Sequence, residues 1–424
     1  MRSYRLAIRV ASALLVLPMA AGQPTGPTAG QPVAGAGRPV AAGAGAPHRP
    51  CPAPAPPVAR PARPSPPPSD PARQTVGGPE LATAGLAVPP RAPEPPKLTA
   101  TSWLVADLTS GVVLGGCGPH EYGVPASAQK LLLAATVMPT LDPAQVVEVT
   151  QSDLDFEPGS SAVGLVRGGR YSVETLWLGL LLNSGNDAAN VLARLGGGPA
   201  GVAGGLEAMN AEARKLGAYQ THAATPSGLD GPGQFTSAYD VALIARACFA
   251  RDDFRRYVSA RLAQIPPQPP TNPGGFQIVN DNQLLHRYPG ALGGKTGYTD
   301  LARHSFVGAA ERGGRRLLVT LLGAESQPLA GWQQGAALLD WGFALPAEAS
   351  VGQLVAREHA PSQLAGADAA HAADSSDSRS AVAGWPLTVS ALAAAALLAA
   401  LLLRFVLIRR RAHLAGRGAD RASR

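Results

Sequence analysis

Three short clusters of reactive side chains lie in order along the chain, and the spacing of each is one that catalysis can use. Ser127 and Lys130 are three positions apart, Ser184 and Asn186 are two apart, and Lys295 opens a Lys-Thr-Gly triplet. A serine hydroxyl is a weak nucleophile until a base removes its proton, and a lysine with a lowered pKa can be that base. The combination predicts a nucleophile, a base, a second hydroxyl with an amide, and a cation that holds a carboxylate.

The first cluster is predicted on a buried helix. Pro125 suits the first turn of a helix, and an apolar run from Leu131 to Ala135 follows it. Residues three apart on a helix share a face, so Ser127 and Lys130 point the same way, and the run buries Lys130. Taken alone, the pair is also compatible with a capping serine and an exposed lysine.

The second cluster marks a corner between two helices. Gly185 is expected to end one helix, and Asn186 or Asp187 to cap the next. This common structural use does not exclude chemistry, because a corner can project side chains into a cleft. In a reaction, Ser184 would relay a proton to a leaving amine and Asn186 would hydrogen-bond the peptide of the substrate.

The third cluster is predicted on a strand that lines a cleft. Lys295 is suited to fixing a carboxylate, Thr296 adds a donor, and Gly297 lets a substrate backbone approach. The backbone N–H groups of Ser127 and Tyr298 are candidates for an oxyanion hole.

Other chemistries fit the sequence less well. A phosphate-binding loop ending in Gly-Lys-Thr needs glycine where Pro289 stands. No G-x-S-x-G elbow surrounds Ser127 or Ser184. The Cys and His spacing gives no zinc pattern, so neither a metal nor a cofactor is expected. Four histidines are interpreted as surface or structural residues: His120, His222, His286 and His304.

Apolar periodicity predicts that these clusters share one α/β domain. Strands are expected at both ends of the domain and helices between them, giving an antiparallel sheet built from both chain ends plus a helical lobe. The site is then expected between lobe and sheet. The expected strands are 102–107, 112–114, 294–299, 305–310 and 315–322. The expected helices are 125–137, 173–182, 187–195, 206–216, 236–250 and 329–341.

The two ends of the chain carry export and membrane signals. Residues 1–22 combine arginines, an apolar run and small residues, as signal peptides do, with an uncleaved anchor as the alternative. Residues 385–408 are predicted to be a transmembrane helix, since 19 uncharged residues run from Trp385 to Leu403. The basic tail 409–424 marks the cytoplasmic side. We therefore expect a single-pass cell-membrane protein with an extracytoplasmic catalytic domain.

Composition divides the remainder of the chain. Residues 23–98 hold 22 of the 41 prolines and are predicted to be a disordered arm, whereas 99–350 form the folded domain and 351–384 a linker. The formal net charge of +7 comes from the tails and the arm. Residues 99–350 contain 17 Lys and Arg against 21 Asp and Glu, a net of −4. This balance argues against a nucleic-acid partner.

The three cysteines leave two alternatives open. Cys51 falls in the predicted arm, and Cys117 and Cys248 fall in the domain. In an oxidising compartment the latter two could form a bridge, or they could be two buried thiols.

Longer stretches around the clusters carry a family resemblance. They read PASAQK, YSVETLWLGLLLNSGNDAAN, TPSGLD and GGKTGYTDLARHSFVGAA. Over roughly 100–345 the chain resembles the serine-type D-alanyl-D-alanine carboxypeptidases, the low-molecular-mass penicillin-binding proteins, of actinobacterial type. The resemblance implies a penicillin-binding/β-lactamase-like fold, peptidoglycan stem peptides and β-lactams as ligands, and an acyl-enzyme that water hydrolyses.

Carried over to this chain, the resemblance assigns a role to each cluster. It makes Ser127 the nucleophile, Lys130 the base, Ser184 and Asn186 the second pair, and Lys295 with Thr296 the carboxylate anchor. One departure concerns Arg303, which stands where many members have glycine. This arginine is expected to alter the edge of the cleft.

Three other functions remain as alternatives. A β-lactamase needs a base for the deacylating water, and Glu207 with Asn210 lies too near the second cluster and at the wrong spacing. Slow deacylation, and hence penicillin sensitivity, is therefore expected. A D,D-transpeptidase would use an amine in place of water. A non-catalytic wall-binding protein is disfavoured by the intact clusters.

Overall fold

The computed structural model describes residues 48–55, 59–60, 62 and 64–355 of the chain. The predicted signal peptide, transmembrane helix and basic tail lie outside the described residues, as does most of the predicted linker. None of the helices formed by the described residues is both long enough and apolar enough to cross a membrane.

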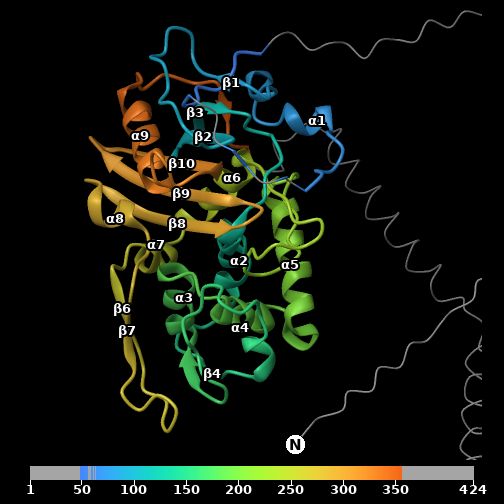
Figure 1. Cartoon of the computed structure of the whole chain (residues 1–424), viewed down its shortest axis with the longest axis vertical. Coiled ribbons are helices and arrows are strands. Elements are labelled where there is room, and N and C mark those ends of the chain that lie inside the picture. Colours follow the sequence, from blue (N-terminus) through green and yellow to red (C-terminus); the bar gives the residue numbers. More distant parts are fainter. Residues whose placement is uncertain (1–47, 56–58, 61, 63, 356–424) are drawn as a thin grey trace, which may run out of the picture. The chain divides into compact units, whose positions relative to one another are not determined.

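A seven-stranded antiparallel sheet forms the centre of the fold (Figure 1). Its order is β1-β3-β2-β10-β9-β8, and β11 also pairs with β3. Because Val105 of β2 pairs with Val319 of β10, an early segment and a late segment share one sheet, as predicted. The strands are β1 Leu86–Ala87, β2 Ser102–Asp107, β3 Val112–Cys117, β8 Ala291–Thr299, β9 Arg303–Arg312, β10 Arg315–Ala324 and β11 Gly352–Gln353. Two further pairs are β4 Val146–Glu148 with β5 Arg170–Ser172, and β6 Leu262–Ile265 with β7 Phe276–Val279.

Helices cover both faces of the sheet and build a separate lobe. The α-helices are α1 Pro71–Gln74, α2 Lys130–Val137, α3 Val173–Leu182, α4 Asn186–Gly196, α5 Gly201–Leu216, α6 Ala238–Phe249, α7 Asp252–Val258, α8 Gln283–Arg287 and α9 Gly331–Ala344. Short 3-10 turns are η1 Pro79–Leu81, η2 Ala126–Gln129, η3 Met138–Thr140, η4 Gln151–Leu154 and η5 Gly198–Ala200. α6 packs on β2 and β10, while α9 packs on β9 and β10. α2 lies among α4, α5 and α6, at the centre of the lobe.

The sheet is buried on both faces because its strands alternate two sets of apolar side chains. In β2, Trp103 and Val105 join the cluster that includes α9, and Leu104 and Ala106 join the cluster that includes the helical lobe. Successive side chains of a strand point to opposite faces, so one strand serves both cores. The lobe is thereby fixed to the sheet.

Local signals explain where several elements begin and turn. Ser172 and Ser237 accept hydrogen bonds from the backbone amides at the starts of α3 and α6. Gly313 and Gly314 have φ values of 58° and 78° in the turn between β9 and β10, a conformation that glycine adopts without strain. The predicted strands and the main helices of the domain are confirmed, with ends that differ by a few residues.

The predicted disordered arm is wrong for its described second half. Leu81 and Leu98 are fully buried, and Leu86 of β1 pairs with Cys117 of β3. The prediction failed because proline-rich composition conceals a few apolar residues spaced along the segment. A proline-rich chain lacks amide donors but can still lie extended at the edge of a sheet.

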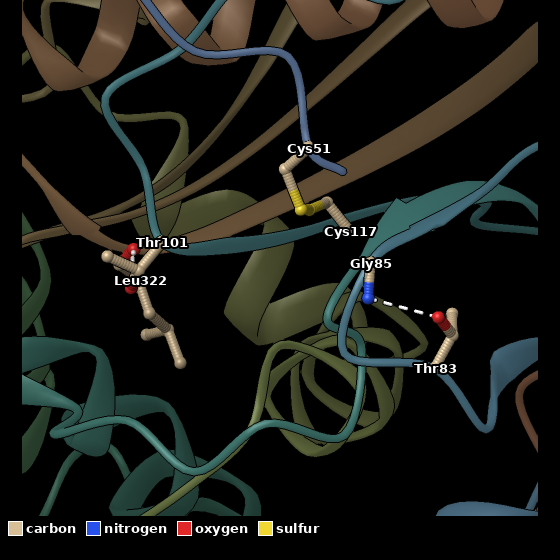
Figure 2. Close-up of a disulfide and its surroundings, with 6 residues drawn as sticks. All are labelled: Cys51, Thr83, Gly85, Thr101, Cys117 and Leu322. Atoms are coloured by element: carbon tan, nitrogen blue, oxygen red, sulfur yellow. Dashed lines mark hydrogen bonds between the residues drawn. A yellow bond between two sulfur atoms is a disulfide. The ribbon is translucent and has the colours of Figure 1, made fainter. Parts of the chain in front are cut away.

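Both alternatives for the cysteines were also incorrect for Cys117. Cys51 forms a disulfide with Cys117, across 66 positions of sequence (Figure 2). Cys248 is a buried free thiol on α6, and its Sγ donates to the carbonyl of Leu131 at 3.2 Å. The disulfide joins the start of the described chain to β3, so the arm is covalently part of the domain.

Candidate active site

The nucleophile candidate stands in a tight turn at the entrance to α2. Ser127 lies in η2, and α2 begins at Lys130, so the predicted helix starts with a 3-10 turn. Residues three apart eclipse in such a turn, which brings the two side chains directly together. Lys130 Nζ lies 2.9 Å from Ser127 Oγ. Ala126, just before the serine, has a φ of 46°, a conformation that is unfavourable for a residue with a side chain.

Lys130 is completely buried, as predicted, and it is surrounded by oxygen atoms. Besides Ser127 Oγ, its Nζ lies 2.7 Å from Asn186 Oδ1 and 2.8 Å from the carbonyl of Ser227. Burial, and then the charge of Lys295, lower the Lys130 pKa well below its usual value, and Asp187 partly opposes this. A neutral amine has two N–H groups for the latter two oxygens and a lone pair for the serine proton. The site can therefore accept that proton.

Ser184 occupies a strained corner between α3 and α4. Its φ is 65°, and its Oγ is buried without a hydrogen-bond partner among the described residues. Gly185 takes the N-cap position of α4, so the prediction that Asn186 or Asp187 caps this helix is wrong. Asp187 lies inside the first turn. Strain and an unsatisfied hydroxyl at one residue are features that active sites tolerate and cores avoid.

Asn186 links the corner to the lysine. Its Oδ1 accepts from Lys130, and its Nδ2 donates to Ser160 Oγ at 2.9 Å. Each end of the amide therefore has one hydrogen-bond partner, which leaves the second N–H of the NH₂ group, and the side chain is only 2% exposed. Ser160 was not identified from the sequence, because the segment between α2 and α3 has no periodic pattern.

β8 brings the third cluster against the nucleophile. A Cβ added to Gly297 would lie 2.7 Å from the backbone nitrogen of Ser127, so only glycine permits this approach. Ser305 on β9 fixes the same junction, since its Oγ donates to the carbonyl of Pro125 at 2.7 Å. Tyr298 follows Gly297 directly and lines the same cleft as Ser127.

Lys295 lies behind the surface of the cleft. Its side chain is 2% exposed, and its Nζ donates to the carbonyl of Thr296 at 2.7 Å. Burial lowers the Lys295 pKa to about 8, and the negative charge of Asp281 partly opposes this. Lys295 thus keeps its proton near neutral pH, while Lys130 is the more easily deprotonated of the two. A cation at this depth attracts a carboxylate held by Thr296 above it.

The three clusters converge on one cleft of about 410 Å³. Ser127, Ser184, Asn186 and Thr296–Tyr298 of β8 all line it. The other lining residues are Gly159, Ser160, Ser161, Gly228, Leu229, Asp281, Thr299 and His304. Gly228 and Leu229 belong to the TPSGLD stretch, so a sequence signal existed for them. For Asp281 and the serines of 159–161 no such signal was present.

The structural interpretation of the histidines needs one correction. His120 is buried as a structural residue, but His304 borders the cleft. The His304 ring lies 4.8 Å from the ring of Tyr298. Burial lowers the His304 pKa. It was missed because β9 was predicted to begin at Ser305, one residue after it.

Arg303, which stands where the resemblance has glycine, adopts a left-handed backbone conformation of the kind that favours glycine. Its φ is 57°, and its guanidinium pairs with buried Glu325 at 3.0 Å. The same guanidinium donates to the hydroxyl of Tyr298 at 2.9 Å. The ion pair holds a strained residue in place, so the arginine stiffens this edge of the cleft.

Among the residues that the structure describes, no three His, Cys, Asp or Glu side chains gather as a metal site. The cleft offers hydroxyls, amides and two buried cations, which suit acyl transfer from a peptide better than metal or redox chemistry. The absence of a cofactor requirement stays a prediction.

Comparison with known proteins gives one consistent result. A family model described as D-alanyl-D-alanine carboxypeptidase matches residues 90–326. D-alanyl-D-alanine carboxypeptidase DacB2 of Mycobacterium tuberculosis is 47% identical over 261 residues, which cover 60% of this chain and 86% of the relative. DacD of Escherichia coli is 34% identical and matches over 60% of this chain and 65% of its own length.

Solved structures agree with the sequence relatives. The crystal structure of a D-alanyl-D-alanine carboxypeptidase from Mycobacterium tuberculosis H37Rv superimposes with a TM-score of 0.59 at 43% identity, covering 63% of this chain and 99% of that one. The Streptomyces K15 DD-transpeptidase gives a TM-score of 0.56 at 27% identity, over 59% and 99% of the two chains. These likenesses are to penicillin-binding DD-peptidases with the predicted sheet and helices.

Proposed function

Because the chain belongs to the D-alanyl-D-alanine carboxypeptidase family, we propose that it removes the terminal D-alanine from peptidoglycan stem pentapeptides through an acyl-enzyme on Ser127. The single observation that carries this mechanism is the contact between Lys130 Nζ and Ser127 Oγ, 2.9 Å apart in a site that lowers the lysine pKa. A base of lowered pKa beside a hydroxyl is what nucleophilic acyl transfer requires.

In the first step, neutral Lys130 takes the proton of Ser127 as its Oγ attacks the carbonyl carbon of the penultimate D-alanine. The negative charge that develops on the carbonyl oxygen is stabilised by the backbone N–H groups of Ser127 and Tyr298. Both groups stand at the η2–β8 junction, where Gly297 permits close approach. Preorganised donors of this kind act without reorganisation during the reaction.

The second step releases D-alanine. The leaving nitrogen needs a proton, and the hydroxyl of Ser184 stands in the cleft without a competing hydrogen-bond partner among the described residues. Ser184 relays the proton that Lys130 received. Thr296 and the charge of Lys295 hold the terminal carboxylate of the substrate, and Asn186 holds its peptide. Water then attacks the ester carbonyl while Lys130, again neutral, takes a proton from it. The ester bond breaks, the shortened peptide leaves as a carboxylic acid, and Lys130 passes the water proton to Ser127 Oγ.

Penicillins would acylate the same serine, because their ring presents a strained amide and a carboxylate with a similar spacing. Rapid β-lactam hydrolysis is not favoured. Both amide atoms of Asn210 on α5 bond the backbone of Ala223, and neither Glu207 nor Asn210 lines the cleft. The acyl-enzyme formed with a penicillin is therefore expected to be long-lived.

The test is labelling of the full-length chain with a fluorescent penicillin, with D-alanine release from a Lys-D-Ala-D-Ala peptide assayed in parallel. We expect labelling and release, and loss of both in Ser127→Ala. Ser259→Ala removes an exposed serine that does not line the cleft, and it should keep both signals.

The two readouts separate the functions. Labelling without D-alanine release would favour transfer to an amine acceptor and contradict the carboxypeptidase. Rapid turnover of a chromogenic cephalosporin would instead indicate a β-lactamase. A folded wild-type chain that takes no label at Ser127 would leave only a wall-binding role.

The cellular location is proposed from the sequence alone. A signal peptide at 1–22 and a membrane-spanning helix at 385–408 would put the domain outside the cell membrane, next to the wall that it modifies. Fractionation of cells that express the full-length chain, followed by protease treatment of intact spheroplasts, tests this. A domain protected from external protease would contradict the proposed topology.

A further inference from the structure

Asp187 is a fully buried carboxylate that is satisfied almost entirely by backbone amides. It lies in the first turn of α4 and is 1% exposed. Its Oδ1 accepts from the amides of Val163 and Ala188 at 2.9 and 2.8 Å, and its Oδ2 accepts from Gly164 and Leu165 at 2.9 and 3.0 Å. Three of these four donors come from a segment more than 20 positions earlier in the chain. Without the carboxylate, the amides of Val163 and Leu165, two buried residues, would be unsatisfied.

The segment that Asp187 binds continues into the wall of the cleft. Residues 159–161 line the cleft, and the carbonyl of Ser161 accepts from the backbone amide of Asn186 at 2.9 Å. On the other side of the corner, Asn183 donates to the carbonyl of Ala162 at 3.0 Å. A Cβ on Gly185 would lie 2.9 Å from the nitrogen of Val163, so segment and corner are in close contact. These contacts hold the segment 161–163 against the corner between α3 and α4.

The hydroxyl of Ser160 transmits this arrangement to Asn186. Ser160 Oγ donates its proton to the carbonyl of Glu157 at 2.6 Å, so its oxygen is left as an acceptor. Only the NH₂ end of the Asn186 amide can bond to that oxygen. The Oδ1 end is therefore directed toward Lys130, 2.7 Å away. A reversed amide would place N–H groups against the lysine, and Ser160 Oγ would lose the hydrogen bond that it accepts from Asn186.

We propose that Asp187 is a positioning residue for the base: through the segment 160–165 and the hydroxyl of Ser160 it fixes the orientation of Asn186, and thereby the place of Lys130 beside Ser127. The inference rests on the proposed function, since it assigns Lys130 the role of base. Asp187 touches no reacting atom. Its charge acts on Lys130 as well, because it opposes the lowering of the Lys130 pKa by burial and by Lys295.

The test compares Asp187→Asn and Ser160→Ala in the full-length chain, by the rate of acylation with fluorescent penicillin as a function of pH. An asparagine can offer one oxygen where the carboxylate offers two, so Asp187→Asn should lower the maximal rate about tenfold or more. It should also move the acid limb of the profile to lower pH, because removal of a negative charge lowers the Lys130 pKa further. Ser160→Ala should lower the rate about tenfold without moving that limb, since no charge changes.

A matched control separates positioning from stability. Asp153 is another fully buried carboxylate of the lobe, bound to Arg194 and remote from the lining of the cleft. Asp153→Asn should lower the melting temperature and leave both the acid limb and the rate below melting within about twofold of wild type.

The inference is overturned if Asp187→Asn acylates like wild type. It is also overturned if this variant loses rate only in step with its melting temperature, as a purely structural change would, with the acid limb unmoved. Wild-type protein that is not acylated at Ser127 would instead refute the proposed function. The two failures are therefore distinguishable.

Discussion

Two places in the domain bury ionisable side chains, and they do so in opposite ways. Asp153 is fully buried but pairs with Arg194 at 2.8 Å and also accepts from Thr150. Lys130 and Lys295 are equally buried, yet no carboxylate pairs with either within ion-pair distance among the described residues. The Asp153 pair satisfies a structural requirement, whereas the lysine site keeps two amines buried without a counter-charge, at a cost in stability. Because its buried amines lack a counter-charge, the lysine site is the one of the two places that is suited to catalysis.

The largest expected effect comes from Lys130→Met, which removes the base and keeps much of the side-chain volume. Acylation by penicillin should fall by at least about 10³-fold, because the serine loses its proton acceptor. Thermal stability should stay the same or rise, since a buried amine without a counter-charge is replaced by an apolar group. Stopped-flow labelling and a melting curve measure both. Loss of stability together with activity would mean that the lysine has a structural role like that of Arg194.

Arg194→Met should do the opposite of Lys130→Met: it should lower stability and leave acylation nearly unchanged. Asp153 is then left buried without its counter-charge, which should cost about 3 kcal/mol in the free energy of unfolding. Acylation measured well below the melting temperature should stay within about twofold of wild type. Urea unfolding and the labelling assay give the two numbers. A specific loss of acylation would show that the two sites are coupled through α4.

Ser184→Gly sharpens the contrast at the strained corner. Glycine adopts a φ of 65° freely, so relief of strain should stabilise the protein by about 1 kcal/mol. Release of D-alanine should fall about 10²-fold, because the proton relay to the leaving nitrogen is lost. Ser172→Gly is the matched change at an ordinary helix cap and should do the reverse, costing a little stability and leaving turnover intact. Turnover that survives Ser184→Gly would remove Ser184 from the mechanism.

The most gradual effect is the pH dependence that Lys295 gives to stability and to substrate binding. Its pKa is about 8 in the folded protein, below the usual 10.5, so the unfolded chain binds more protons between these values. Folding is therefore favoured as pH rises from about 8 to 10.5, by up to about 3 kcal/mol from this group. Substrate affinity should change in the opposite direction, because neutral Lys295 no longer attracts a carboxylate.

Melting curves and KM values for wild type and Lys295→Met over pH 7 to 10 measure the two trends. The stability gain with pH should be smaller in the variant, and the rise in KM should disappear. A variant whose pH dependence matches the wild type in both would show that other groups titrate in this range.

The sequence predicted the site better than it predicted what surrounds the site. Ser127, Lys130, Ser184 and Asn186 were assigned from spacing, and the structure brings them together because short helices and turns fix neighbours locally. The roles of these residues remain predictions. Ser160 and the partners of Asp187 could not be found in this way, since their contacts join segments that only the tertiary fold brings into register.

The fold was predictable where one pattern dominates. The sequences of β2 and β10 consist mostly of apolar residues with strong strand preference, so both segments were recognised as strands. The proline-rich segment before them was not, because a mean composition says nothing of Leu81 and Leu98, the two residues that anchor it. The partner of Cys117 was missed for the same reason, as Cys51 was assigned to a part of the chain expected to have no fixed place.

The pairing of β2 with β10 also constrains the order in which the protein can fold. Val105 finds its neighbour Val319 only after the whole helical lobe has been synthesised between them. The closing of so long a loop delays the pairing of β2 with β10, whereas the helices of the lobe form from local contacts. Until then β2 and β3 expose two apolar faces with no covering layer, so a chain that stops before residue 315 retains all three clusters of reactive residues and still lacks β10, the strand that joins β2 to β9.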